Sequence, residues 1–232
     1  MRVKNNILIL DTETVGDFGQ PFVHDIGYCI IDKDFNVLKA TRHLVKQARH
    51  CKWALNYSDF YKTKAQLYDK AIESGDVDIK SWKEIMDEFV GDLKKYKVGC
   101  ISAYNLAFDY RALNFTNQFL NNGDLTFEKL LDKKKWLCIW NLACETILDS
   151  GDYKDWCKEN NCISEAGNYM TNAECSYRYI TGRLGFNEEH TALADVLIEK
   201  DILKYIVENS KGRPQYGLQY GCWKKIQDKA TK

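Results

Sequence analysis

Proline occurs only twice among 232 residues, and the sequence contains neither an internal repeat nor a low-complexity linker. Together with a 45 % content of hydrophobic residues, this scarcity argues against disorder over most of the chain. The length fits one large domain, or one domain with a small appendage. We therefore expect a packed globular protein.

Net charge is also absent, because 33 lysines and arginines balance 33 aspartates and glutamates. Proteins that coat duplex nucleic acid through bulk charge are usually basic overall, so this balance argues against that class. A local basic groove remains compatible with the composition.

Long hydrophobic runs are missing as well. No stretch approaches the length of a membrane span, and the first apolar run, residues 7–10, is too short for a signal peptide. Nine cysteines are present, but none forms a CxxC pair. We expect reduced, mostly buried thiols rather than a zinc site, and a cytoplasmic protein without a membrane partner.

The hydrophobic pattern indicates strands first and then alternating strands and helices, which is typical of a layered α/β domain. The predicted strands are residues 7–10, 25–32, 35–45, 98–104 and 136–140. The predicted helices begin at a capping box at Ser81–Glu84, at Asp109 and near Leu142, and helices dominate from there to about residue 209.

We expect residues 1–210 to form one domain, with an aromatic-rich insertion at about residues 50–75. This insertion either grips substrate or belongs to the core. Residues 211–232 combine glycines, a proline, aromatic residues and lysines, which indicates a C-terminal tail or docking segment.

Two carboxylates, Asp11 and Glu13, follow the apolar run of residues 7–10. Side chains at positions i and i+2 of an extended chain project to the same side. Ionised carboxylates at the end of a buried strand are costly unless they are paired or bind a metal, and oxygen ligands suit Mg²⁺ or Mn²⁺. The alternative is a solvated strand end with acidic residues.

A third carboxylate, Asp109, follows the predicted strand of residues 98–104 at the start of a predicted helix. Aspartate is a favoured N-cap and first-turn residue, so helix capping is the alternative to a functional role. Taken alone, Asp109 is more typical of a helix N-cap than of a functional site.

A fourth carboxylate, Asp195, lies among small and apolar residues of a predicted helix, five residues after His190. Five residues of an ideal helix turn through about 140° relative to the start, so we expect His190 on the loop or first turn before the helix. From there it could reach a site that Asp195 lines; the alternative is an ordinary surface histidine. His24, His43 and His50 have no frame of carboxylates or cysteines, and we expect them on the surface.

Together these elements occur in the order Asp-Thr-Glu (residues 11–13), Asn-x-x-Phe-Asp (residues 105–109) and His-x-Ala-x-x-Asp (residues 190–195). The order resembles the DnaQ-like DEDDh 3′→5′ exonuclease superfamily, over roughly residues 6–206. The sister class has tyrosine four residues before the last aspartate. Here that position is Thr191, with a histidine one residue earlier, which indicates the histidine type.

The resemblance implies an RNase H-like α/β fold, with a central mixed β-sheet flanked by α-helices. It also implies two divalent ions, Mg²⁺ or Mn²⁺, and release of nucleoside 5′-monophosphates from the 3′ end of single-stranded nucleic acid. By this analogy Asp11, Glu13 and Asp195 hold the ion that activates water, Asp11 bridges to the second ion near Asp109, and His190 is the general base. The residues expected to contact substrate are Thr12, Thr14, Val15, Asn105 and Phe108, with Thr14 and Val15 acting through backbone groups.

Several functions remain open within this class. DNA is the favoured substrate; the alternatives are an RNA-trimming enzyme of the RNase T or oligoribonuclease kind and a polymerase-associated proofreading subunit. A polymerase or another replication or repair partner would bind residues 211–232. A non-catalytic binding module would be expected to lack one of the carboxylates, and all four are present with the histidine. The oligomeric state is open, a homodimer included.

Overall fold

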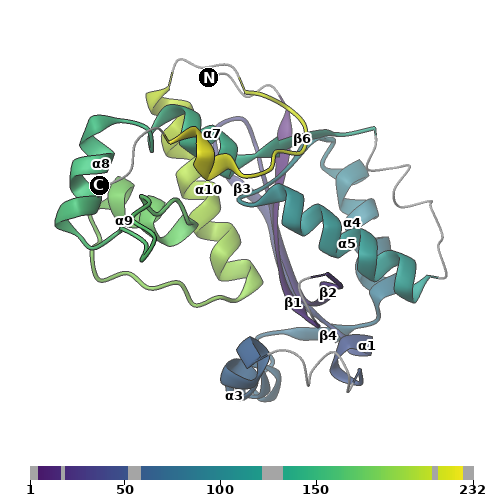
Figure 1. The fold of residues 1–232 in the computed structure, drawn as a ribbon. Coiled ribbons are helices and arrows are strands. Elements are labelled where there is room, and N and C mark those ends of the chain that lie inside the picture. The colour runs from purple at the N-terminus through teal and green to yellow at the C-terminus, as the bar shows by residue number, and fades with distance from the viewer. Residues whose placement is uncertain (1–4, 17–18, 52–58, 122–132, 211–213, 227–232) are drawn as a thin grey trace.

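The computed structural model describes residues 5–16, 19–51, 59–121, 133–210 and 214–226 (Figure 1). Over these residues the chain folds into a single mixed β-sheet with helices on both faces. The predicted fold class is therefore confirmed.

The sheet has six strands among the described residues, in the order β4-β3-β2-β1-β5-β6. Strands β1, β2 and β3 pair in antiparallel fashion, whereas β5 runs parallel to β1 and to β6, and β4 runs parallel to β3. The bounds are β1 Asn6–Val15, β2 Phe22–Ile31, β3 Val37–Val45, β4 Asp78–Lys80, β5 Val98–Ala103 and β6 Lys135–Cys138.

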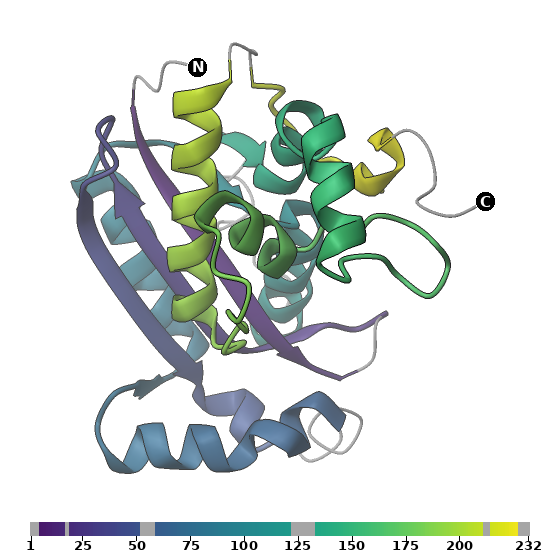
Figure 2. The same ribbon diagram turned by 90° about the vertical axis from the view of Figure 1, so that its left-hand side faces the viewer.

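Helices cover the sheet in two layers (Figures 1 and 2). One face carries α1, α4 and α5, and the other carries α10, which α7 and α9 support from behind. The bounds are α1 Lys46–Arg49, α3 Asp59–Glu73, α4 Trp82–Lys95, α5 Leu106–Leu120, α7 Ile139–Thr146, α8 Gly151–Glu159, α9 Ala173–Thr181, α10 Ala192–Asn209 and the 3₁₀ helix η1 Cys222–Lys225.

The central strand β2 is buried at all of its ten positions. This is expected for a strand covered on both faces, whose side chains cannot alternate between core and solvent. Because β5 runs parallel to β1, the carboxyl ends of these two strands lie at the same edge of the sheet. The C-terminal half of β1, Asp11 to Val15, and the segment that follows β5, Tyr104 to Asp109, are thereby brought together.

Several predicted boundaries are confirmed and others are wrong. The capping box at Ser81 and Glu84 begins α4 as predicted. Asp109 is not the cap of its helix: α5 begins at Leu106, with Asn105 at the N-cap, and Asp109 lies in the first turn. The strand predicted at residues 136–140 ends at Cys138, because the chain turns there into α7.

Two of the histidines expected on the surface are buried, which corrects that prediction. The exposed fraction of His24 is 1 % and that of His43 is 2 %. The ring of His24 packs edge-on against Tyr68 of α3, and burial together with the charges of Arg49 and Arg42 lowers the pKa of His24 to about 3. Both positions are covered by segments distant in sequence, which the local pattern around them does not show.

The aromatic-rich segment around residues 50–75 contributes α3, which lies beyond the end of the sheet in Figure 2. Its Tyr68 is buried and packs with Leu44 and Val77 in a small second core. The described part of the segment thus has a core role at Tyr68. Trp53 and Tyr57 lie outside the described residues.

The described part of the C-terminal segment, residues 214–226, packs against β6 and α7. Tyr216 forms an antiparallel bridge with Leu137, and the N–H of Gly217 donates to the carbonyl of Trp136 at 2.8 Å. The side chain of Cys222 is buried, and Lys225 pairs with Glu145 of α7. Residues 214–226 therefore dock onto their own domain.

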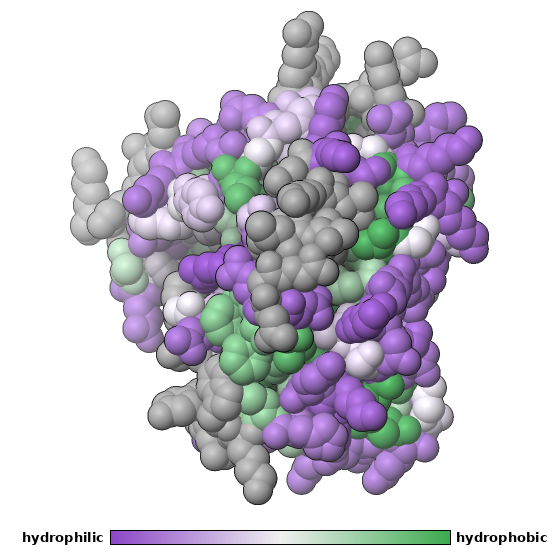
Figure 3. Space-filling model, turned by 90° about the vertical axis from the view of Figure 1, so that its right-hand side faces the viewer, coloured by the Kyte–Doolittle hydropathy of each residue, from purple (hydrophilic) through white to green (hydrophobic). Residues whose placement is uncertain are grey.

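Figure 3 shows the side of the molecule that α4 and α5 occupy in Figure 1. Over its coloured residues, hydrophobic side chains form small separate groups between hydrophilic ones. Among the described helices, none is long and apolar enough to cross a membrane.

Candidate active site

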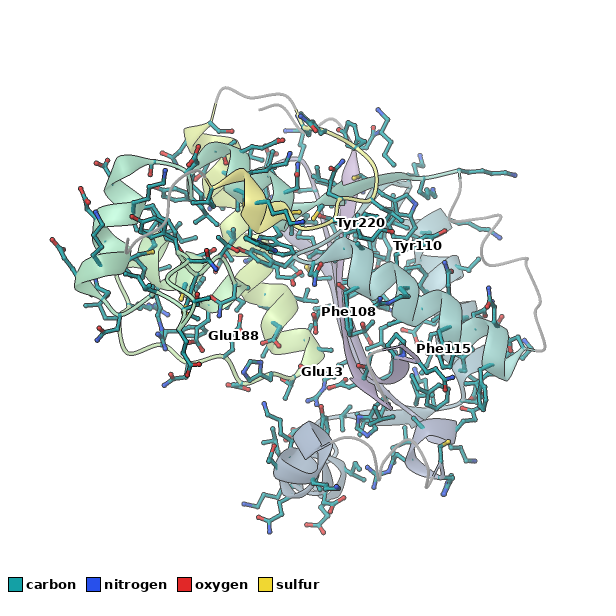
Figure 4. The ribbon with its side chains drawn as sticks, viewed as in Figure 1. Glu13, Phe108, Tyr110, Phe115, Glu188 and Tyr220 are labelled. Carbon is teal, nitrogen blue, oxygen red and sulfur yellow. The ribbon has the colours of Figure 1, made fainter. Side chains whose placement is uncertain are left out.

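A cavity of about 200 Å³ lies where the ends of β1 and β5 meet the start of α10. Its walls carry six carboxyl groups beside the ring of His190, contributed by Asp11, Glu13, Asp109, Glu188, Asp195 and Glu199. In Figure 4, Glu13, Phe108 and Glu188 lie around the space between α5 and α10, whereas Phe115 and Tyr220 lie away from it. The four carboxylates predicted from the motifs are thus brought together.

Thr12, in the motif of residues 11–13, fixes the orientation of Asp109, in the motif of residues 105–109. Asp11 and Glu13 share one side of β1, and Thr12 between them faces the start of α5. The backbone N–H of Thr12 donates to Oδ1 of Asp109 at 3.1 Å, and its hydroxyl donates to the same oxygen at 2.8 Å. Two hydrogen bonds to one oxygen fix the orientation of the Asp109 carboxylate and leave its other oxygen for the cavity.

The start of α10 lies close to β2 because position 27 has no side chain. A Cβ on Gly27 would lie 2.5 Å from the backbone carbon of Ala192 and 2.5 Å from the nitrogen of Leu193. Buried Asp25 then accepts a hydrogen bond from the N–H of Ala192 at 3.3 Å and pairs with Arg42 at 2.8 Å. These contacts bring the first turns of α10 over the end of β1.

Asp195 and Glu199 lie one helical turn apart on α10, so both carboxylates face the same cavity. Both residues are buried, with exposed fractions of 8 % and 3 %. Oδ1 of Asp195 and Oε2 of Glu199 have no hydrogen-bond partner among the described residues. Buried carboxylate oxygens without partners are costly, and a bound cation would supply the missing interaction.

His190 lies in the loop just before α10, which confirms its predicted position. Its backbone has a φ of 50°, in the left-handed region that a non-glycine residue rarely adopts and that is often found at functional sites. One ring nitrogen lies within 4.8 Å of carboxylate oxygens of both Glu13 and Asp195. The side chain is 44 % exposed, so the ring is open to solvent on one side.

The cavity gathers buried acids, and burial raises the pKa of each of them. Burial raises the pKa of Glu13 to about 9, with Asp195 and Asp25 adding to the rise. Burial also raises the pKa of Asp109 to about 7 and that of Asp195 to about 6. The pKa of Asp11 is raised well above its ordinary value by burial and by the surrounding carboxylates.

This donor set fits hard divalent cations. The carboxylates offer only oxygen, which suits Mg²⁺ or Mn²⁺ rather than zinc. Oδ1 of Asp195 and Oε2 of Glu199, which have no hydrogen-bond partner among the described residues, and the repulsion of Asp11 by the surrounding carboxylates fit a site that binds cations. A cation bound here would lower the pKa of every acid around it.

The predicted substrate residues divide into two groups. Thr12, Asn105 and Phe108 line the cavity. The side chains of Thr14 and Val15 do not, and Val15 is buried in the hydrophobic core. Contact through the backbone of these two residues stays a prediction.

Sequence reasoning missed two acids of the cavity. Glu199 follows Asp195 by four residues, and this spacing on one helix face was the available signal. Burial raises its pKa well above the ordinary value, with Asp109 adding to the rise. Glu188 precedes the histidine by two residues; burial raises its pKa to about 8, with Asp195 and Glu174 adding to the rise.

Two solved structures share this fold at low sequence identity. Cell-death related nuclease 4 gives a TM-score of 0.55 at 13 % identity, over 88 % of this chain and 64 % of that chain. E. coli Exonuclease I, solved in complex with a dT oligonucleotide, gives a TM-score of 0.54 at 15 % identity, over 89 % of this chain and 42 % of that one. This chain thus spans less than two thirds of the length of either. No protein-family model and no curated protein sequence matches it.

Proposed function

Since the chain has the fold of the DnaQ-like exonuclease superfamily, we propose that it is a metal-dependent 3′→5′ exonuclease of the histidine type. It would release nucleoside 5′-monophosphates from the 3′ end of single-stranded nucleic acid, with DNA as the favoured substrate. The observation that carries this proposal is the single cavity in which Asp11, Glu13, Asp109 and Asp195 meet His190.

The assignment of residues to two divalent ions is taken by analogy with the superfamily. Asp11, Glu13 and Asp195 would hold one ion, and Asp11 with Asp109 would hold the other. When bound, two such ions stabilise negative charge on the attacking and leaving oxygens of a phosphodiester. Their charge would also remove the repulsion that raises the pKa of Asp11.

His190 is suited to accept a proton. Burial and the nearby charge of Lys64 lower the pKa of His190 below its ordinary value, so that the ring is neutral at pH 7 and a nitrogen lone pair is available. The ring lies beside Glu13 and Asp195 and is open to solvent on one side, where water can enter. His190 would take a proton from the attacking water, a step that contributes about 10²–10⁴-fold in enzymes of this kind.

The remaining cavity residues would place the strand end. A volume of about 200 Å³ is small, so one strand end would enter and a duplex would have to fray first. The amide of Asn105 and the ring of Phe108 lie at the start of α5, next to Asp109, where they can contact the terminal sugar and base. Residues 211–232 remain the candidate segment for a polymerase or another replication or repair partner.

The test is a degradation assay on 5′-labelled single-stranded DNA and RNA of one sequence, in Mg²⁺, in Mn²⁺ and in EDTA. We expect a ladder that shortens one nucleotide at a time from the 3′ end, requires a divalent ion and is faster on DNA. A faster ladder on RNA would reassign the enzyme to RNA trimming. Absence of any ladder on both polymers, from protein with an intact thermal transition, would refute the proposal.

A further inference from the structure

A second cavity, of about 400 Å³, adjoins the carboxylate cavity and shares Tyr104, Asn105 and Ala173 with it. We propose that this second cavity binds a nucleobase of the strand whose 3′ end enters the carboxylate cavity. The inference rests on the proposed function, because it assigns the neighbouring part of the same strand.

The chemistry of the walls selects a neutral, flat ligand. None of the described residues that line the second cavity carries a charge. Its lining includes the large apolar side chains of Trp140, Tyr169, Met170 and Trp223. Nucleobases stack on aromatic side chains whatever their sequence, whereas a phosphate or an acidic peptide requires cationic groups. The carboxylate cavity, with its six carboxyl groups, suits cations and a phosphate group, whereas the second cavity suits a base.

Polar groups among the lining residues match the edges of a base. Asn105 and Asn168 contribute side-chain amides, which carry both donors and acceptors, and Ser164 contributes a hydroxyl. Asn105 also lines the carboxylate cavity, so a strand bound there passes directly into the second cavity. Continuity at this residue favours a nucleic-acid strand over an unrelated small molecule.

The walls are held in place by hydrogen bonds that converge on Thr171. The hydroxyl of Tyr104 donates to the Thr171 carbonyl at 2.7 Å, and the indole N–H of Trp140 donates to the Thr171 hydroxyl at 2.8 Å. These bonds tie the end of β5 and the start of α7 to the loop before α9. A preformed pocket loses little entropy when it binds, which favours a built site over an accidental gap.

The C-terminal segment closes the cavity on one side. Trp223 of η1 lines it and remains 44 % exposed, so part of its ring is available for stacking beside Lys224, whose Nζ lies 5.7 Å from the ring centroid. Residues 214–226 are packed on β6 and α7, and this packing puts Trp223 in place. Residues 214–226 would therefore form one wall of the base-binding pocket.

The test measures binding of short single-stranded oligonucleotides in EDTA, so that no turnover is needed. The probes are an oligothymidylate and an abasic deoxyribose-phosphate oligomer of the same length, read by tryptophan fluorescence and by Kd. The variants of the full chain are Trp223→Ala, Trp223→Phe and Tyr220→Ala. Tyr220 is the matched control, because it is 77 % exposed on the same segment and does not line the cavity.

We expect Trp223→Ala to weaken oligothymidylate binding about 5- to 150-fold, the range found for loss of one base–aromatic stack. Binding of the abasic oligomer should not change, Trp223→Phe should restore most of the affinity, and Tyr220→Ala should have no effect. Asn168→Asp, which introduces a negative charge without removing a wall, should weaken the same probe.

Equal binding of the base-containing and abasic oligomers by the wild type would overturn the proposal. So would equal losses in Trp223→Ala and Tyr220→Ala, or binding of free thymidine 5′-monophosphate as tight as that of the oligomer. Because the readout is binding in EDTA, it is independent of hydrolysis. If the binding results contradict the base pocket while the 3′ ladder is seen, only the base-pocket proposal is refuted. If the oligomer binds as expected and no ladder is seen, only the exonuclease proposal is refuted.

Discussion

Lys64 of α3 donates a hydrogen bond to the backbone carbonyl of Glu189, the residue that precedes His190. A second contact, at 3.4 Å, reaches the carbonyl of His190 itself. The helix from the aromatic-rich segment thus holds the loop on which the proposed general base lies. That loop includes the positive φ of His190, a conformation that persists only where its surroundings support it.

The first prediction concerns Lys64→Ala. Loss of the contact to Glu189 should displace His190 and lower kcat roughly 10- to 100-fold, because small displacements of a reacting group are costly. Lys64 also lowers the pKa of His190, so the acidic limb of the pH profile of kcat should move to higher pH in the variant. Steady-state kinetics from pH 5 to 9 measures both effects. Lys70→Ala, on the exposed side of the same helix, is the control, and identical profiles for the two variants would contradict the assignment.

The second prediction concerns Glu199→Gln. Removing one buried acid from the cavity reduces like-charge repulsion, so the metal-free protein should melt at a higher temperature at pH 8. The same change should weaken stabilisation by Mg²⁺, because one negative charge near the ions is lost. Thermal melts in EDTA and in a Mg²⁺ series measure both. Glu208→Gln, on the exposed end of α10, should change neither, and an unaltered response in Glu199→Gln would exclude Glu199 from the site.

The third prediction concerns the pH dependence of stability without divalent ions. The raised pKa values, about 6 for Asp195, 7 for Asp109, 8 for Glu188 and 9 for Glu13, mean that the folded state holds protons that the unfolded state has released. The free energy of unfolding in EDTA should therefore fall as pH rises from about 5 to 9, with Asp195 contributing at the low end of this range and Glu13 at the high end. Mg²⁺ should restore stability most at the high end of this range. Urea unfolding at pH 6, 7.5 and 9 gives the slope, and a free energy independent of pH in EDTA would contradict the charge pattern.

The fourth prediction concerns Gly27→Ala. The added methyl group would meet the backbone at Ala192 and Leu193, so α10 must shift away from β2. Overpacking of this kind typically costs about 1–3 kcal/mol, and activity should fall as Asp195 moves with the helix. Gly91→Ala is the matched control: it lies within α4 with open space around its Cβ, and should stabilise by about 0.5–1 kcal/mol. Equal effects of the two changes on chemical denaturation and kcat would refute the close approach.

Much of the cavity could be predicted because four of its acids either follow an apolar run or lie in the first turn of a helix. Asp11 and Glu13 follow an unbroken apolar run, and Asp195 lies among small and apolar residues, so each position is unusual for a charge. The order of the motifs then predicts that these acids lie close together in the fold. The parallel pairing of β1 and β5 brings the first two motifs together. The roles of these residues stay predictions.

What local patterns could not show depends on packing between distant segments. Glu199 has the sequence surroundings of an ordinary helical glutamate, and only the position of α10 over β1 buries it. His24 is buried because Tyr68 of α3 covers it. The short strand β4 was not predicted, because three residues with an exposed Ile79 have no strand pattern without their partner β3.

The most direct test of the central claim is the initial rate of mononucleotide release from 3′-labelled single-stranded DNA in Mg²⁺. Asp11→Asn should abolish release, and His190→Ala should lower it about 10²–10⁴-fold while leaving Mg²⁺-dependent thermal stabilisation intact. Asp87→Asn, an exposed carboxylate on α4, should release nucleotides at the wild-type rate. Wild-type rates from folded Asp11→Asn, or from His190→Ala, would contradict the assignment of this cavity as the active site.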